Sequence, residues 1–187
     1  MRRFVAAASL VVATVSLAAC GSVVAPPSTS TTTSLAQTTT TPVATSACTT
    51  QQLGVTSSGN SGMGHIGVVL IFTNISATPC SEVGFPGVAG LTANGVQAVQ
   101  AIRTSRGYLG GGTRIQAVTL ATGESASAIV EGTDVPSGNA TSCPTYPRLL
   151  VTPPNAMDSV TVNAVMPGCS PIEVHPVFSG TTGMHQG

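Results

Sequence analysis

Short apolar runs separated by turn residues follow one another from residue 48 to residue 178. Residues 68–72 are apolar without a break and predict a central strand, His65–Asn74, that is buried on both faces. Asn94-Gly95 lies between two apolar runs and predicts a hairpin with a type I′ turn, in which both central residues have a positive φ. Further strands are expected at residues 52–57, 88–92, 96–102, 115–120, 125–130, 148–152, 159–165 and 172–178.

This pattern places the chain in the all-β class. No stretch of about a dozen residues keeps a helical period. About eight or nine short strands with frequent turns are typical of an antiparallel β-sandwich, and here they favour an immunoglobulin-like layout. Because the sequence has no Trp and few other aromatic residues, its core must be built from Val, Ile, Leu and Ala.

Residues 1–19 have the pattern of a secretory signal peptide. Arg2 and Arg3 form a positive n-region, and the following residues are apolar or small, over a run shorter than the roughly 20 that span a bilayer comfortably. The run ends in Leu17-Ala18-Ala19-Cys20, which resembles the bacterial lipobox. We therefore expect Cys20 to carry acyl chains such as palmitate and to anchor the exported protein to the outer face of the cell membrane. Ordinary cleavage beside a chance cysteine is the alternative.

Residues 20–47 are expected to form a disordered stalk behind this anchor. They are almost entirely Ser, Thr, Pro, Ala and Val, and they carry no charge and no aromatic residue. Such a segment cannot bury enough apolar surface to offset the conformational entropy lost on ordering. Its threonine-rich tracts with proline also suit O-glycosylation. The stalk leads to a folded domain at residues 48–178, and residues 179–187 are expected to be a flexible tail.

The charge of the mature chain excludes two classes of partner. Removing Arg2 and Arg3 with the signal peptide leaves four of the six basic residues against six acidic ones, and there is no Lys. Nucleic-acid binding needs a basic stripe to neutralise phosphates, and attraction to anionic lipid needs a polybasic cluster. Neither is present, so the membrane is expected as a partner only through the N-terminal lipid.

Four cysteines remain once Cys20 is set aside. An even number in an oxidising compartment predicts two disulfides, and no pair has the C-x₂₋₄-C spacing of a metal site. We expect sequential pairing, because each bridge then closes a local unit around the first or the last strands, although the two other connectivities remain open. The expected bridges are Cys48–Cys80 and Cys143–Cys169.

One pattern is more specific than composition. Asn74-Ile75-Ser76, Pro79-Cys80 and Gly84-Phe85-Pro86-Gly87-Val88 follow one another after the first cysteine of the domain. This arrangement resembles a family of domains of unknown function, type 4232, found in secreted and membrane-tethered lipoproteins of actinobacteria. The resemblance covers nearly all of the chain after the stalk. It implies an exported β-sandwich domain and brings no catalytic motif with it.

The best candidate for a binding loop is the glycine-rich loop, residues 103–112. Arg103 and Arg106 lie in it, Arg114 follows it, and Tyr108 is its aromatic residue. A loop with arginines and one aromatic ring can hold a carboxylate, a phosphate or a glycan. The alternative is a solvated loop that merely connects two strands.

Metal binding is a weaker possibility. The soft or borderline ligands Met63, His65, His175, Met184 and His185 suit copper in an exported protein, but they lack any repeated spacing. His65 is explained more simply as the first residue of a strand. We therefore predict no cofactor and no metal, and keep copper binding as an alternative.

An enzyme is not expected. Residues 123–127 read Gly-Glu-Ser-Ala-Ser and lack the final glycine of a nucleophile elbow, which also needs a strand-to-helix turn. The sequence instead favours a cell-envelope lipoprotein that displays a non-catalytic binding or scaffolding module. Its partner would be an envelope protein, a glycan or a lipid. A carrier that holds a lipid or glycan between its sheets or under the glycine-rich loop is the alternative.

Overall fold

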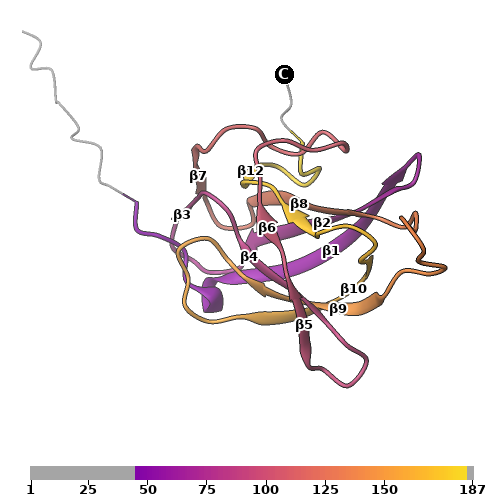
Figure 1. Cartoon of the computed structure of the whole chain (residues 1–187). Helices are drawn as coiled ribbons and strands as arrows, with labels where there is room; N and C mark the ends of the chain where they lie inside the picture. Colours follow the sequence, from indigo (N-terminus) through magenta and orange to yellow (C-terminus); the bar gives the residue numbers. More distant parts are fainter. Residues whose placement is uncertain (1–44, 185–187) are drawn as a thin grey trace, which may run out of the picture. The chain divides into compact units, whose positions relative to one another are not determined.

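The computed structural model describes residues 45–184 (Figure 1). The predicted signal peptide, the lipidation site Cys20, most of the predicted stalk and His185 lie outside these residues. In the part described, no helix is long and apolar enough to cross a membrane.

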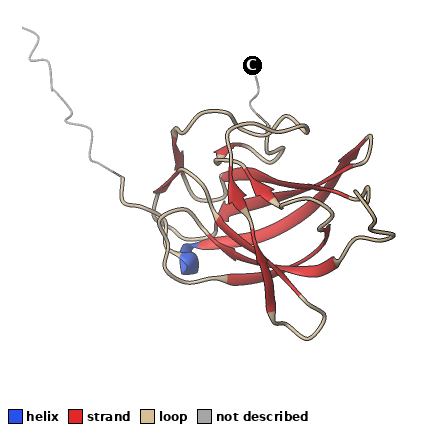
Figure 2. Ribbon diagram, viewed as in Figure 1, coloured by secondary structure: helices blue, strands red, loops and turns tan. Residues whose placement is uncertain are grey.

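Strands make up the regular structure, and a single 3₁₀ turn, η1, precedes the first of them (Figure 2). Residues 45–184 contain no α-helix, as the sequence predicts. The elements are η1 Thr50–Gln52, β1 Leu53–Gly62, β2 His65–Asn74, β3 Cys80–Val83, β4 Gly87–Leu91, β5 Gln97–Gln100, β6 Ile102–Arg103, β7 Ala117–Leu120, β8 Ser125–Thr133, β9 Thr145–Thr152, β10 Val160–Pro167, β11 Glu173–Val174 and β12 Phe178–Ser179.

The strands form two main sheets. The larger sheet has the order β1-β2-β8-β11-β6, and β12 also pairs with β8. The smaller has the order β10-β9-β4-β5, while β3 and β7 form a separate two-stranded sheet. All pairs are antiparallel except β6 with β11. The antiparallel β-sandwich expected from the sequence is confirmed (Figures 1 and 2).

The core lies between the two main sheets and follows the two-residue period of each strand. Alternate residues of β2 and β8 point toward the smaller sheet. They meet apolar side chains of β4, β9 and β10. Val, Leu, Ile and Ala make up most of this cluster, as expected, and Phe72 and Met166 are added to them. The largest fully buried members of this cluster are Phe72, Leu70, Leu120, Leu149, Met166 and Ile172.

Intervening residues of β2 and β8 point to the other side of the large sheet, which we call the outer face. Val69 and Ile129 lie there and are also buried. The central position of β2 between β1 and β8, and its burial on both faces, agree with the apolar run from which it was predicted.

The sequence predicts a type I′ turn at Asn94-Gly95, but the structure has such a turn at Met63-Gly64 instead. Met63 and Gly64 join β1 to β2 with φ values of 49° and 83°, as a two-residue type I′ turn requires. At the other hairpin, Gly95 has a φ of 82°, whereas Asn94 is not among the described residues with positive φ. Because Gly95 N–H donates to Thr92 O and Thr92 N–H donates to Val96 O, this is a three-residue loop that ends in a left-handed glycine. The predicted hairpin is confirmed, but the predicted type I′ turn at Asn94-Gly95 is wrong.

Two disulfides close the domain with the sequential pairing expected. Cys48 is joined to Cys80 and Cys143 to Cys169. The first bridge is buried, while the second is half-exposed at the surface. Each bridge therefore holds together a local unit, one at the start and one near the end of the domain.

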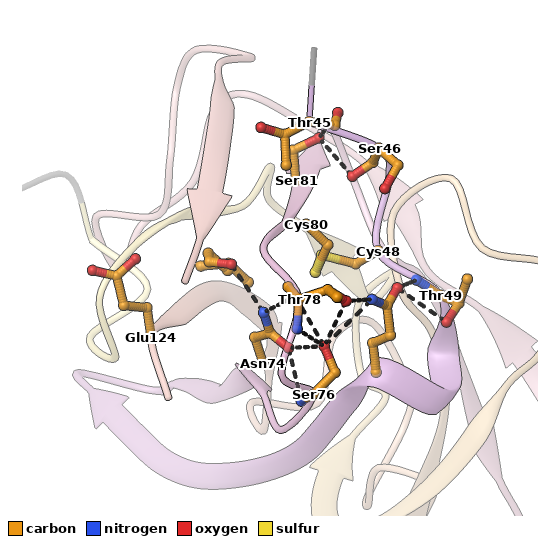
Figure 3. The surroundings of a disulfide bond; sticks show 12 residues. Thr45, Ser46, Cys48, Thr49, Asn74, Ser76, Thr78, Cys80, Ser81 and Glu124 are labelled. Carbon is orange, nitrogen blue, oxygen red and sulfur yellow. Dashed lines mark hydrogen bonds between the residues drawn. A yellow bond between two sulfur atoms is a disulfide. The ribbon is translucent and has the colours of Figure 1, made fainter. Parts of the chain in front are cut away.

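The Asn-x-Ser motif beside the first bridge is structural. Asn74 is fully buried; its amide nitrogen donates to Thr78 O and Leu120 O, both at 2.9 Å. Its amide oxygen accepts from the backbone N–H and the hydroxyl of Ser76, at 2.9 and 2.8 Å (Figure 3). The Asn74 side chain thus fastens the end of β2 to the segment that leads into Cys80.

The packed part of the domain extends beyond residue 178, where the sequence predicts a flexible tail. Gly183 N–H donates to the Ser127 hydroxyl at 2.8 Å, and Gly183 packs against Ile129 and Val69. Met184 forms an isolated β-bridge with Gly111. Residues 179–184 therefore cover apolar side chains of the outer face, which polar composition alone did not reveal.

Candidate functional site

Strand register brings polar residues together on the outer face. His65 of β2 lies opposite Thr133 of β8, and Glu173 of β11 lies opposite Glu131 of β8. Directly opposed residues of antiparallel strands share a face, as do residues two apart on one strand. His65, Thr133, Glu131 and Glu173 therefore form a polar group at one end of the large sheet.

Glu131 fixes the glycine-rich loop. Its side chain is nearly buried, with the residue 2% exposed. Tyr108 N–H donates to Oε1 and Oε2 at 3.1 and 3.2 Å, and Leu109 N–H donates to Oε2 at 3.1 Å. Buried backbone N–H groups need acceptors, and charge-assisted bonds to a carboxylate are stronger than neutral ones. The Glu131 carboxylate thus accepts the hydrogen bonds that the backbone of a neighbouring strand would accept in a sheet.

His175 contacts the same loop at Gly112. It is fully buried, and its Nδ1 lies 3.1 Å from Gly112 O. Because a carbonyl only accepts, Nδ1 carries a proton and donates. The other ring nitrogen, Nε2, lies 3.3 Å from Glu131 Oε1 in an ion-pair contact that does not meet the geometry of a hydrogen bond. Nε2 is thus buried beside the carboxylate without a hydrogen-bond partner in the described part of the chain.

The glycines of the loop allow this close approach. A Cβ at Gly107 would overlap Glu131 Oε1, one at Gly111 would overlap the His175 ring, and one at Gly112 would overlap the Phe178 ring. Gly111 and Gly112 are buried. The glycine-rich loop is therefore packed against the sheet, and at these three positions a larger side chain would not fit.

A pocket lies beside the loop where it carries Tyr108. The Tyr108 and His65 rings are stacked, with centroids 4.0 Å apart and planes at 19°. The pocket has a volume of about 250 Å³, and a second hollow of about 390 Å³ also includes Tyr108 and His65 in its lining. We call the first one the Tyr108 pocket; it is lined by His65, Tyr108, Glu131, Gly132, Thr133, Ser170, Pro171 and Glu173.

The sequence identified this region only in part. Arg103, Arg106, Arg114 and Tyr108 are all exposed, and within residues 45–184 no arginine forms an ion pair with a carboxylate. Tyr108 is the member of this predicted set that lines the pocket. Glu131 and Glu173 were missed as site residues, although Glu131 had one visible signal, a charge directly after the apolar run of β8.

The members of the predicted copper set have separate roles where the structure describes them. Met63 is 102% exposed at the β1–β2 turn, and His65 stacks on Tyr108. His175 is buried beside Glu131. The backbone of Met184 pairs with Gly111. Across residues 45–184, no three or more His, Cys, Asp or Glu side chains form a group that could hold a metal ion.

A second buried carboxyl lies away from this region. Glu82 of β3 is opposite Val118 of β7 and is fully buried. Neither of its carboxyl oxygens has a hydrogen-bond partner in the described part of the chain. Burial raises the pKa of Glu82 from 4.5 to about 8, because a desolvated charge is unfavourable. Glu82 is therefore held as a neutral acid at neutral pH.

Comparison with known proteins gives a family and no function. No curated protein matches the chain, and no solved structure matches it. Residues 48–178 match the family described as Domain of unknown function (DUF4232), a span that begins at the first disulfide cysteine and ends at Phe178. Because this match covers most of the chain, the protein belongs to the DUF4232 family.

Proposed function

We propose that this protein is an exported, lipid-anchored component of the cell envelope whose β-sandwich is a non-catalytic binding module. The Tyr108 pocket is its ligand site. The observation that carries the proposal is the position of Tyr108, which is 77% exposed although the backbone at that residue is tied to buried Glu131.

An exposed aromatic ring on a fixed loop is suited to binding. Folding gains little from a ring left in water, whereas a partner gains its apolar area when it covers the ring. Because the loop is already held by Glu131 and His175, a ligand need not spend binding free energy on ordering it. The stack on His65 further limits the orientations of the Tyr108 ring.

The groups beside the pocket support a non-catalytic role. His175, the histidine next to Glu131, is fully buried, and its Nδ1 is engaged by Gly112 O. The Ser170 hydroxyl, which lines the pocket, accepts from Thr133 N–H at 3.1 Å and donates to Pro171 O at 3.2 Å. A nucleophile needs a base within reach, and neither group is arranged for that task.

Site-specific photo-crosslinking tests the binding proposal. A photoreactive benzoylphenylalanine replaces Met63, which lines the hollow that shares Tyr108, or Met157, which is 95% exposed elsewhere. In the intact envelope, a discrete adduct is expected from position 63, absent from position 157, and lost when Tyr108→Ala is added. Equal adducts from both positions, or an adduct that persists without Tyr108, would contradict the proposal.

The anchor is tested separately. Cys20→Ala is expected to abolish acylation, so that the chain stays as a precursor or leaves the membrane fraction. Two or three acyl chains, at about 0.8 kcal/mol per buried CH₂, hold a protein firmly, and their loss is expected to be visible on fractionation. A variant that is processed and fractionates with membranes like the parent would refute the lipid anchor.

A further inference from the structure

We propose that the Tyr108 pocket binds an organic cation, an alkylammonium or guanidinium group. The charge of the ligand lies against Glu173 and its apolar part lies against the Tyr108 ring. This inference rests on the proposed function, because it names the chemistry of the ligand for the same pocket.

The first argument is the placement of charge. Glu131 and Glu173 are directly opposed across β8 and β11, an arrangement that destabilises a sheet when both residues carry like charge. His175 contacts Glu131, but within residues 45–184 no arginine pairs with either carboxylate. The pocket therefore has an excess of negative charge that a bound cation would neutralise.

The two carboxylates have different tasks. Glu131 already accepts three backbone hydrogen bonds and contacts His175, so most of its acceptor capacity is committed to the loop. Glu173 is half-buried, lines the pocket, and has no ion-pair partner in the described part of the chain. Glu173 is thus the group that makes the direct contact, and Glu131 adds negative charge behind it.

The second argument is independent of the charges. The Tyr108 ring packs on His65 yet remains mostly exposed. The apolar groups that surround the charge of an organic cation can lie against the face of such a ring, whose quadrupole attracts positive charge, and aromatic rings are common partners of quaternary ammonium groups. A volume of about 250 Å³ is below the roughly 300–1,000 Å³ typical of drug-sized ligands, which fits a group of side-chain size.

The chemistry favours an organic cation over a metal ion. A divalent ion needs several ligands converging on one point, and residues 45–184 hold no such group of three or more His, Cys, Asp or Glu side chains. An ammonium or guanidinium group needs only one direct carboxylate partner and an apolar surface, and both are present.

The test uses choline and its neutral isostere 3,3-dimethyl-1-butanol, with argininamide as the guanidinium probe. Each is titrated into the full mature chain while the backbone amide signals of Tyr108, Leu109 and Thr133 are followed by NMR. Choline or argininamide is expected to shift these signals saturably, and the neutral isostere at least about tenfold more weakly, equivalent to about 1.4 kcal/mol.

Two glutamate variants separate the site from the surface. Glu173→Gln is expected to weaken cation binding about tenfold or more without loss of thermal stability, because it removes like-charge repulsion in the free protein. Glu124→Gln, on an exposed turn, is the matched control and should bind as the parent does. Equal binding of the neutral isostere, or unchanged binding by Glu173→Gln, would overturn the inference.

The outcome also distinguishes this inference from the proposed function. If the Tyr108-dependent crosslink at position 63 forms while neither cation binds, the pocket is a binding site for another chemistry and the inference is wrong. Saturable Ca²⁺ binding that depends on Glu173, without cation binding, would also overturn it. If crosslinking and cation binding both fail, the inference and the proposed function are both wrong.

Discussion

Glu131 Oε1 lies 3.3 Å from His175 Nε2 beneath the glycine-rich loop, and this pair joins β8 to the segment after β11. From the pair, hydrogen bonds reach Tyr108 and Leu109 through the carboxylate and Gly112 through the imidazole. At this end of the outer face the loop is thus held by polar contacts, whereas the space between the sheets is closed by apolar side chains. The position of Tyr108 depends on this arrangement.

Glu131→Gln should release the loop. The amide has nearly the same shape, but it loses the charge, so the bonds from Tyr108 and Leu109 are no longer charge-assisted. With its oxygen at the Oε2 position, which both N–H groups reach, its NH2 group replaces the Oε1 acceptor of Tyr108 N–H. Hydrogen bonds to charged groups contribute about 1.5–3 kcal/mol, so a loss of about 2–3 kcal/mol in the free energy of unfolding is expected. Denaturant unfolding measures this loss, and hydrogen exchange should show faster exchange at Tyr108 and Leu109. Unchanged protection of these amides would show that the loop does not depend on the carboxylate.

Gly111→Ala should destabilise the domain through a steric clash. The added Cβ would overlap the His175 ring, which has no space to move because it is fully buried. Overpacking of this kind costs about 1–3 kcal/mol or more, measured as a lower melting temperature. Gly59→Ala is the control, since a Cβ there has no neighbour within 4 Å and β1 is already extended. Equal stability of the two variants would mean that the loop is not tightly packed.

Local patterns in the sequence predicted much of the sandwich. The unbroken apolar run identified β2 as His65–Asn74, and strands were expected where β4, β7, β8, β9 and β10 occur. β3 was missed because it is short and carries Cys80 and Glu82 at its buried positions, where an apolar pattern was sought. Met63-Gly64 was not recognised as a turn because Met is an unusual residue at positive φ.

The candidate site was less predictable, for a physical reason. Glu131, Glu173 and His175 come together only through the pairing of β8 with β11, which no local pattern encodes. The glycine-rich loop was expected to be a binding loop, with a solvated connection as the alternative, and its packing against the sheet was not foreseen, because composition does not distinguish glycines that provide freedom from glycines that provide space. The disulfide pairing, in contrast, followed from local closure of the chain.

The two disulfides should differ in their resistance to reduction. Cys48 and Cys80 are buried, whereas Cys143 and Cys169 are half-exposed, so a mild reductant should open Cys143–Cys169 first. Each bridge closes a loop of moderate length and contributes on the order of 3 kcal/mol. Timed alkylation with peptide mapping measures the order of opening, and calorimetry follows the fall in melting temperature. Simultaneous opening of both bridges would show that reduction proceeds through global unfolding.

Glu82 should make the stability of the domain depend on pH. Its pKa is about 8 in the folded protein and 4.5 as the reference value, so the folded state binds more protons between these two values. Its contribution to stability is therefore full below about pH 4.5 and is lost as the pH rises through about 8, by up to about 1.4 kcal/mol per pH unit. Glu82→Gln cannot ionise, so its free energy of unfolding should decline less than that of the parent between about pH 5 and about pH 8.

Glu82→Leu separates the cost of the buried polar group from its titration. Because neither carboxyl oxygen has a hydrogen-bond partner in the described part of the chain, an apolar side chain of similar size should stabilise the domain at all pH values. The gain over the parent should grow as the pH rises toward about 8, where the carboxylate of the parent ionises in an apolar environment, and level off at higher pH. Glu124→Gln, at an exposed position, should leave the pH profile of the parent nearly unchanged. If Glu82→Leu destabilises the domain and Glu82→Gln keeps the parent's pH dependence, Glu82 has a partner that stabilises its charged form, and the neutral acid inferred from its burial is wrong.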